Sequence, residues 1–130
     1  MDILELINTN VFLKRLFPNG LTEAVYIGQI GFDVEGRMSV NIHTKQKPAI
    51  EVAKWGNWGV DYNVIVIKLN GLCRDSASLI NWKNAGYGKL TIVKNIETFI
   101  ISQQGTNWSI ELECDALIFN ECSIYIDGAE

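Results

Sequence analysis

The chain has 130 residues, 48% of them hydrophobic, and a net charge of −4 at pH 7. This length, with aromatic and β-branched residues spread along all of it, predicts a single domain over residues 1–130 and argues against extended disorder. The negative charge argues against a nucleic-acid partner, because such partners are held mainly by clustered Lys and Arg side chains.

No apolar run approaches the length of a membrane span, and the first residues lack the basic start of a signal peptide. We therefore expect a cytoplasmic protein with no membrane partner. The three cysteines, Cys73, Cys114 and Cys122, are odd in number and show no CxxC spacing, which favours reduced thiols that pack as small apolar residues.

Residues 2–17 carry apolar side chains at helical spacing, and Asp2 with Glu5 three positions later resembles a capping box. The pattern predicts one N-terminal amphipathic helix over about 2–17. The polar residues 8–10 offer a point where it breaks and restarts, with Asn10 as a new N-cap. The helix must stop before Pro18, which restricts the residue that precedes it.

Beyond residue 20 the apolar period changes from 3.6 to 2, which predicts an antiparallel β-sheet core over about 23–127. Residues 37–43 alternate cleanly, and residues 23–34 are their predicted hairpin partner through the turn at Glu35 and Gly36. The apolar phase slips near Gly28, which indicates a β-bulge there.

Residues 45–59 form the longest irregular stretch and contain two tryptophans, Trp55 and Trp58, next to Lys54. A loop tryptophan can anchor a partner, because it brings a large apolar area and one N–H donor. We take Lys54, Trp55 and Trp58 as candidate partner-binding residues. The alternative, that one or both rings plug an end of the core, stays open.

The unbroken apolar run within residues 60–69 predicts a strand covered on both faces, in the middle of a sheet. Further strands are predicted at 77–82, 89–94, 98–103, 108–114 and 116–126, with a turn around Asp115. Short strands at this spacing predict a mainly β fold, an antiparallel β-sandwich or open barrel with one N-terminal α-helix.

Acidic residues dominate the end of the sequence, since no basic residue follows Lys94. The acidic side chains after it are Glu97, Glu111, Glu113, Asp115, Glu121, Asp127 and Glu130. Glu111 and Glu113 share one face of a predicted strand, and with Asp115 they are candidate partner-binding residues. The alternative is a solvated face without a specific role.

The sequence offers little for catalysis. His43 is the only histidine, and its phase places it on the polar face of its strand. Neither it nor the cysteine spacings match a zinc template, and no phosphate-binding or nucleophile motif is present. Glu111, Glu113 and Asp115 offer a carboxylate pair for glycoside chemistry, but an exposed strand lacks the pocket that raises a carboxyl pKa. We expect no enzyme activity, no cofactor and no metal.

Several segments resemble the immunity protein 50 family of bacterial polymorphic-toxin systems. They are the helix leading into residues 21–25, the hairpin around 32–36, Lys54–Trp55 after the Pro48 loop, the strand at 63–69, Asn81–Trp82, and the closing residues 124–126. The resemblance implies a bacterial cytoplasmic protein that binds and neutralises a cognate toxin. The rival hypothesis is a small-ligand or carbohydrate-binding β-sandwich, in which Trp55 and Trp58 form a stacking platform.

Overall fold

The structure is a computed structural model that describes residues 2–128, so the predicted single domain is described except for Met1, Ala129 and Glu130. The N-terminal segment forms the 3₁₀ helix η1 (Ile3–Leu6), the short strand β1 (Ile7–Asn8) and the helix α1 (Val11–Leu16). The break expected at residues 8–10 is therefore present. Thr9 lies there in the left-handed region at φ 58°.

Side-chain hydrogen bonds explain this local structure. The Leu4 N–H donates to Asp2 Oδ1 at 2.9 Å and caps η1, and the Leu21 N–H donates to Asp2 Oδ2 at 2.9 Å. Asn10 makes no cap bond to α1. Its Nδ2 instead donates to the Leu4 carbonyl at 2.6 Å, which ties the start of α1 to η1.

The predicted hairpin is formed by β2 (Val25–Phe32) and β3 (Arg37–Thr44), which pair antiparallel. Their register shifts between Ile27 and Gln29, so the bulge expected near Gly28 is confirmed. Glycine is required at this position, because a Cβ atom on Gly28 would meet the imidazole ring of His43 on β3.

Two strands are longer than the sequence pattern predicts. β4 (Val64–Ile80) and β7 (Ser109–Tyr125) each run for 17 residues and pair antiparallel. The strands expected at 60–69 and 77–82 are thus one strand, and the turn expected around Asp115 is wrong. The pairing shifts register around Cys73, where residues 74–76 of β4 oppose Glu113 alone, so the strand bends without ending.

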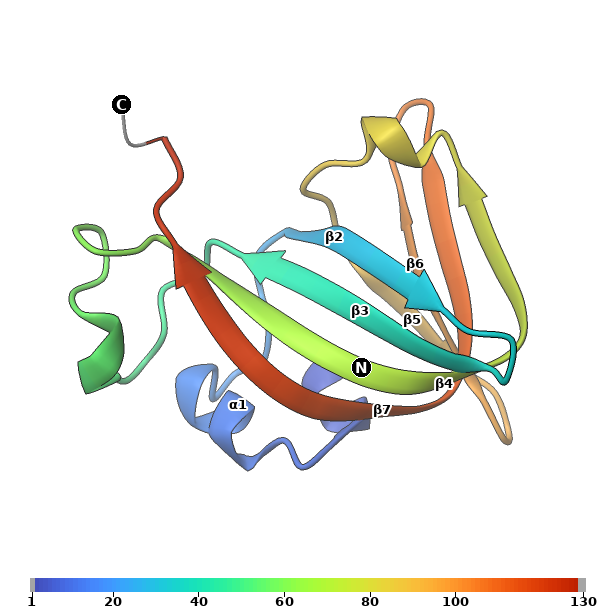
Figure 1. Ribbon diagram of the computed structural model, residues 1–130, viewed down its shortest axis with the longest axis horizontal. Helices are drawn as coiled ribbons and strands as arrows, with labels where there is room; N and C mark the ends of the chain where they lie inside the picture. The colour runs from blue at the N-terminus through green and yellow to red at the C-terminus, as the bar shows by residue number, and fades with distance from the viewer. Residues whose placement is uncertain (1, 129–130) are drawn as a thin grey trace.

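All strands belong to one sheet with the order β2-β3-β4-β7-β6-β5, where β5 is Thr91–Lys94 and β6 is Phe99–Gln104, while β1 pairs parallel with β7. The mainly β, antiparallel fold with one helix near the N-terminus is confirmed as a single open sheet. Figure 1 shows its β2–β3 side and its β5–β6 side meeting at an angle along β4 and β7.

The core lies on the inner side of this bent sheet. Leu13 and Leu16 of α1 are fully buried in one apolar cluster with residues of β3, β4, β6 and β7. Residues 64–67 are all buried and lie between β3 and β7, which confirms the central strand. Two further 3₁₀ helices, η2 (Ala53–Trp55) and η3 (Trp82–Asn84), lie outside the sheet. Within residues 2–128, no helix is long and apolar enough to cross a membrane.

The two edges of the sheet meet at one point. Val25 on β2 forms an antiparallel bridge with Gly88, which precedes β5. Gln103 on β6 is 2% exposed, and its Nε2 donates to the carbonyls of Val25 and Gly88 at 2.9 and 3.0 Å. The two backbone hydrogen bonds of this bridge and the buried Gln103 amide therefore join the two edges at one end of the open sheet.

Candidate functional site

The bend of β4 and β7 gathers charged side chains from four segments. The hairpin turn after β2 meets the bend where the Cys73 N–H donates to the Gly36 carbonyl at 2.7 Å. The turn between β5 and β6 lies there too, since Arg74 reaches Glu97. We call this region the acidic end, and define it by Asp33, Glu35, Asp75, Glu97, Glu113 and Asp115 with the basic Arg37, Arg74 and Lys94.

Ion pairs hold the two arginines of the acidic end. Arg74 donates to Asp115 at 2.9 Å and to Glu97 at 3.2 Å, which joins β4, β7 and the β5–β6 turn. The hydrogen bond that Arg74 donates to Asp115, and then the one that it donates to Glu97, raise the pKa of Arg74 and keep it charged. Arg37 pairs with Asp33 at 2.6 Å and Glu35 at 3.4 Å. Because these ion pairs are exposed, they fix the positions of the side chains but add little to the stability of the fold.

The predicted acidic residues Glu111, Glu113 and Asp115 alternate along β7 and lie on its outer face. Glu111 is exposed opposite Ser78 and Ser102, and in the described part of the chain its carboxylate makes no ion pair. Glu113 accepts a hydrogen bond from Thr98 at 3.3 Å, and Asp115 is held by Arg74. Glu111 thus presents the most accessible charge of the three.

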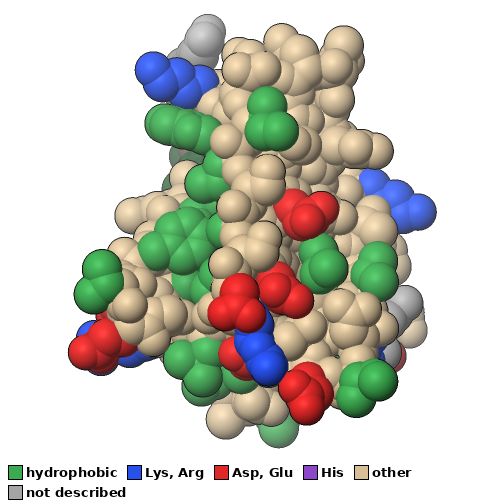
Figure 2. Space-filling model, turned by 90° about the vertical axis from the view of Figure 1, so that its right-hand side faces the viewer, with side chains coloured by type: hydrophobic (Ala, Val, Ile, Leu, Met, Phe, Trp, Pro, Cys, Tyr) green, Lys and Arg blue, Asp and Glu red, His purple; other side chains and the backbone are tan. Residues whose placement is uncertain are grey.

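Six acidic and three basic side chains leave the acidic end with a net charge of −3, and both arginines are already paired. Figure 2 shows acidic side chains grouped around one basic side chain on this face, with hydrophobic side chains between them. Glu121 and Asp127 lie elsewhere on the molecule, where they pair with Lys68 and Lys45 at 3.4 Å each. Glu130 falls outside the described residues.

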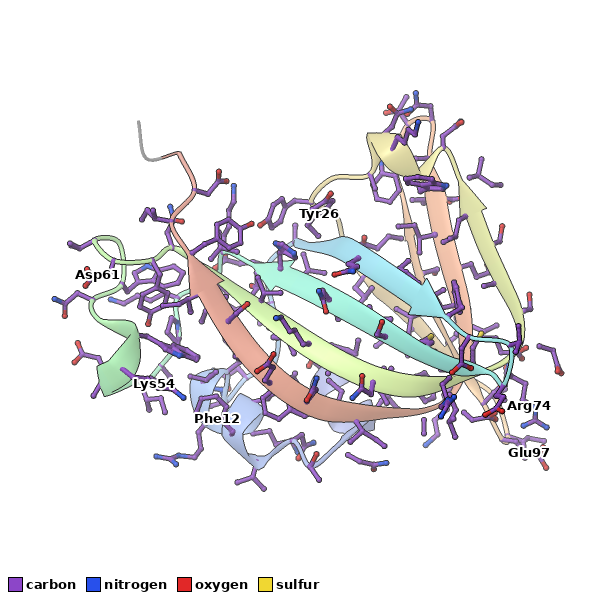
Figure 3. The ribbon with its side chains drawn as sticks, viewed as in Figure 1. Phe12, Tyr26, Lys54, Asp61, Arg74 and Glu97 are labelled. Carbon is purple, nitrogen blue, oxygen red and sulfur yellow. The ribbon has the colours of Figure 1, made fainter. Side chains whose placement is uncertain are left out.

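The tryptophan loop lies at the opposite end of the molecule, as the labels of Lys54, Arg74 and Glu97 show in Figure 3. Trp55 is 7% exposed and packs edge-on against Phe12 and Tyr62, with ring centroids 5.9 and 5.7 Å away. The Trp55 ring therefore completes the core between α1 and the segment before β4, which is the alternative left open above for one of the two tryptophans.

Trp58 is half-buried and Lys54 is exposed, so the loop keeps these two residues at the surface. The Trp58 ring lies edge-on to Tyr62 at 5.3 Å. Since Trp55 is buried beneath the same tyrosine, the two indoles form no joint platform on which a sugar ring could stack. Lys54 and Trp58 are also far from Glu111, Glu113 and Asp115, so the two sets of candidates do not form one site.

His43 lies on the outer face of β3, as its phase predicts, but it is half-buried in an aromatic cluster. Its Nδ1 lies 2.9 Å from the Tyr125 hydroxyl oxygen, and its ring lies edge-on to Tyr26 at 5.3 Å. Burial lowers the pKa of His43. Within residues 2–128, no three His, Cys, Asp or Glu side chains are grouped to hold a metal ion.

The three cysteines carry free thiols, and Cys114 is fully buried. Burial raises the pKa of Cys114 and of Cys122 to about 12, and it also raises the pKa of Cys73, with the carboxylates of Glu113 and Asp115 adding to the shift. At neutral pH these groups are protonated thiols and therefore weak nucleophiles.

Several residues of the acidic end were missed from the sequence, namely Asp33, Glu35, Asp75 and Arg74. No local signal marks them as a group, because they lie in a turn and a bulge that contact each other only through the fold. The polar residues 74–76 between apolar strand residues indicate only an irregularity of the strand itself.

No family model, no curated protein and no solved structure matches this chain in comparisons with known proteins. The resemblance to the immunity protein 50 family therefore rests on the residues quoted above.

Proposed function

We propose that this chain is a non-catalytic binding protein of the immunity type, which neutralises a cognate bacterial toxin in the cytoplasm of the producing cell. The observation that supports the proposal is the convergence of six acidic side chains from four segments on one end of the sheet, where Arg74 orders Asp115 and Glu97. Such a surface is complementary to the basic surface of a nucleic-acid-cleaving toxin.

The absence of catalysis is part of the same proposal. His43 has an aromatic neighbourhood and is turned away from the acidic end, and the thiols at the bend have raised pKa values. The carboxylates of the acidic end lie on an open surface. Charged, exposed carboxylates suit long-range attraction of a partner better than proton transfer.

The first experiment identifies the partner. A tagged copy of the full chain is used to capture proteins from the native host, and mass spectrometry identifies them. The proposal expects a toxin whose activity is abolished by stoichiometric addition of the chain. Capture of no protein with such an activity would contradict it.

The second experiment tests the acidic face of β7, which is formed by Glu111, Glu113 and Asp115. The triple variant Glu111→Gln, Glu113→Gln, Asp115→Asn should associate with the captured toxin roughly tenfold more slowly at low ionic strength, and the difference should shrink at physiological ionic strength because salt screens the attraction. Stopped-flow fluorescence measures both rates.

A matched control changes the same charge elsewhere. The triple variant Glu5→Gln, Glu23→Gln, Glu51→Gln neutralises three exposed carboxylates outside the acidic end. It should retain most of the wild-type rate. Equal slowing by the two triple variants would show that net charge alone acts, and an unchanged rate for the first variant would remove the acidic face from the mechanism.

A further inference from the structure

A groove of about 610 Å³ crosses the outer face of the sheet beside the acidic end. It is lined by residues from β2, β3, β4 and β7, and two large apolar side chains on this face stay exposed to solvent. These are Leu72 and Ile118, which are 46% and 44% exposed. Exposed apolar side chains beside a hollow indicate a surface for binding.

A glycine of the sheet forms the floor of the groove. Gly31, Ser39, Asn70 and Ile118 lie in register across the four strands, so the missing side chain at Gly31 opens space beside the others. Gly71 lines the groove with its backbone only, because a Cβ atom there would point to the core side of the sheet, 3.1 Å from Met38 Cε. The hollow is therefore built into the strands and does not depend on a loop.

Polar groups in the groove are free to bind. Within residues 2–128, neither the Ser39 hydroxyl nor the Asn70 amide takes part in a side-chain hydrogen bond. Asp33 and Arg37 line the groove and form an ion pair. The other charged side chains of the acidic end lie on the same end of the molecule. An apolar centre with a polar and charged rim is the arrangement typical of a protein-binding hot spot.

We propose that this groove receives one large apolar side chain of a partner protein, from a segment in which basic residues flank that side chain. The inference rests on the proposed function and names the chemistry of the partner. Charge decides between the occupants: a second copy of the chain would bring two acidic ends of net charge −3 together, whereas a segment with Lys and Arg beside its apolar side chain would meet opposite charge.

Model peptides test the groove without the natural partner. The full ¹⁵N-labelled chain is titrated with the blocked peptide Lys-Arg-Phe-Arg-Lys, with Lys-Arg-Ser-Arg-Lys, and with Glu-Glu-Phe-Glu-Glu. The proposal expects the Phe peptide to shift the amide signals of Gly31, Gly71 and Ile118 in a saturable way. Replacing Phe by Ser should weaken this binding at least about fivefold, and the acidic peptide should cause no saturable shift.

Three variants complete the design. Ile118→Ser and Leu72→Ser should each weaken binding of the Phe peptide about fivefold or more, and the dispersion of their spectra shows whether they fold. Val11→Ser removes an apolar side chain that is 72% exposed on α1, outside the groove, and should leave binding unchanged. Equal binding of the Phe and Ser peptides, shifts that map outside the groove, or wild-type binding by folded Ile118→Ser would each overturn the proposal.

The peptide result is separate from the toxin result. If the captured toxin binds the folded Ile118→Ser variant as tightly as the wild type, the groove proposal fails while the immunity function stands. If the Phe peptide fills the groove but no captured protein is a toxin, the proposed function fails while the chemistry of the groove stands.

Discussion

At the scale of single residues, His43 shows how a side chain on the polar face of a strand can lose contact with water. Its ring lies between the rings of Tyr26 and Tyr125, and Gly28 on the neighbouring strand leaves the space that the imidazole occupies. The neutral ring fits this aromatic surrounding, whereas a charged imidazolium loses part of its hydration. Burial therefore lowers the pKa of His43 below the ordinary value of 6.5.

This depressed pKa makes stability depend on pH. Below pH 6.5 the unfolded chain binds a proton at His43 more readily than the folded chain, so the free energy of unfolding should fall as the pH falls through this range. Above pH 6.5 both states are neutral there and the contribution is constant. Urea denaturation across this range measures the effect. His43→Gln does not titrate and should show a shallower slope; an identical slope would contradict the assignment.

At the scale of elements, Gln103 reinforces the contact between the two edges of the sheet. Its Nε2 donates to the carbonyls of Val25 and Gly88, while its Oε1 has no partner among the described residues. The opposite orientation of the amide would set an oxygen against two carbonyl oxygens. The edge strand β2 and the segment before β5 are therefore joined by the two backbone hydrogen bonds of the Val25–Gly88 bridge and by this buried donor group.

Substitutions at Gln103 should destabilise the protein in a graded and pH-dependent way. Gln103→Ala removes two hydrogen bonds and should lower the free energy of unfolding by about 1–2 kcal/mol. Gln103→Glu should cost more at neutral pH, because a buried carboxylate would face two carbonyls.

The Gln103→Glu variant should recover stability in acid. Its buried carboxyl has a raised pKa, so protonation in the folded state restores a donor and stability rises as the pH falls. Urea denaturation at neutral and acidic pH, with Gln104→Glu on the exposed end of β6 as the control, measures this. A Gln103→Glu variant that is as stable as the control at neutral pH would show that the closure does not depend on the donor.

Much of this architecture follows from local patterns. The alternation in residues 37–43, the bulge near Gly28 and the central run at 64–67 were all predicted, because each depends on neighbours in sequence. The length of β4 and β7 was not, because residues 74–76 and Asp115 resemble turn sequences. They stay in strands only because the partner strand continues past them, which is a property of pairing between distant segments.

The candidate site was predictable to a similar extent. The acidic character after Lys94 pointed to Glu97, Glu113 and Asp115 of the acidic end, and alternation placed Glu111 and Glu113 on one face. The contribution of Asp33, Glu35 and Asp75 depends on the docking of a hairpin turn onto a bulge. Whether Trp55 is buried or exposed was left open, because burial of a loop ring depends on α1, whose Phe12 covers it.

At the scale of the whole molecule, the backbone of the sheet is shielded from solvent most at its centre and least at its edges. The first part of β4 is flanked by β3 and β7 and is buried on both faces, whereas β5 has four residues and, within residues 2–128, pairs along its length only with β6. Charged and polar residues at the ends of β5, such as Lys94, discourage strands of other molecules from pairing with this edge.

Hydrogen exchange should reproduce this gradient. Amides of residues 64–69 should exchange slowest and open only with global unfolding, and amides of β5 should exchange fastest among the strands. Mass spectrometry of exchanged peptides, or nuclear magnetic resonance for single amides, measures both. Protection of β5 equal to that of β4 would contradict the open edge seen here.

The position of β7 has a consequence for synthesis of the protein on the ribosome. β7 is the last strand in the sequence, yet it lies between β4 and β6 and also pairs with β1. Until residues 109–125 emerge, the β2-β3-β4 and β5-β6 strand groups share no continuous ladder, and β1 has no partner. Once β6 has formed, the nascent chain therefore exposes the unpaired edges of β4 and β6 until β7 joins the two strand groups.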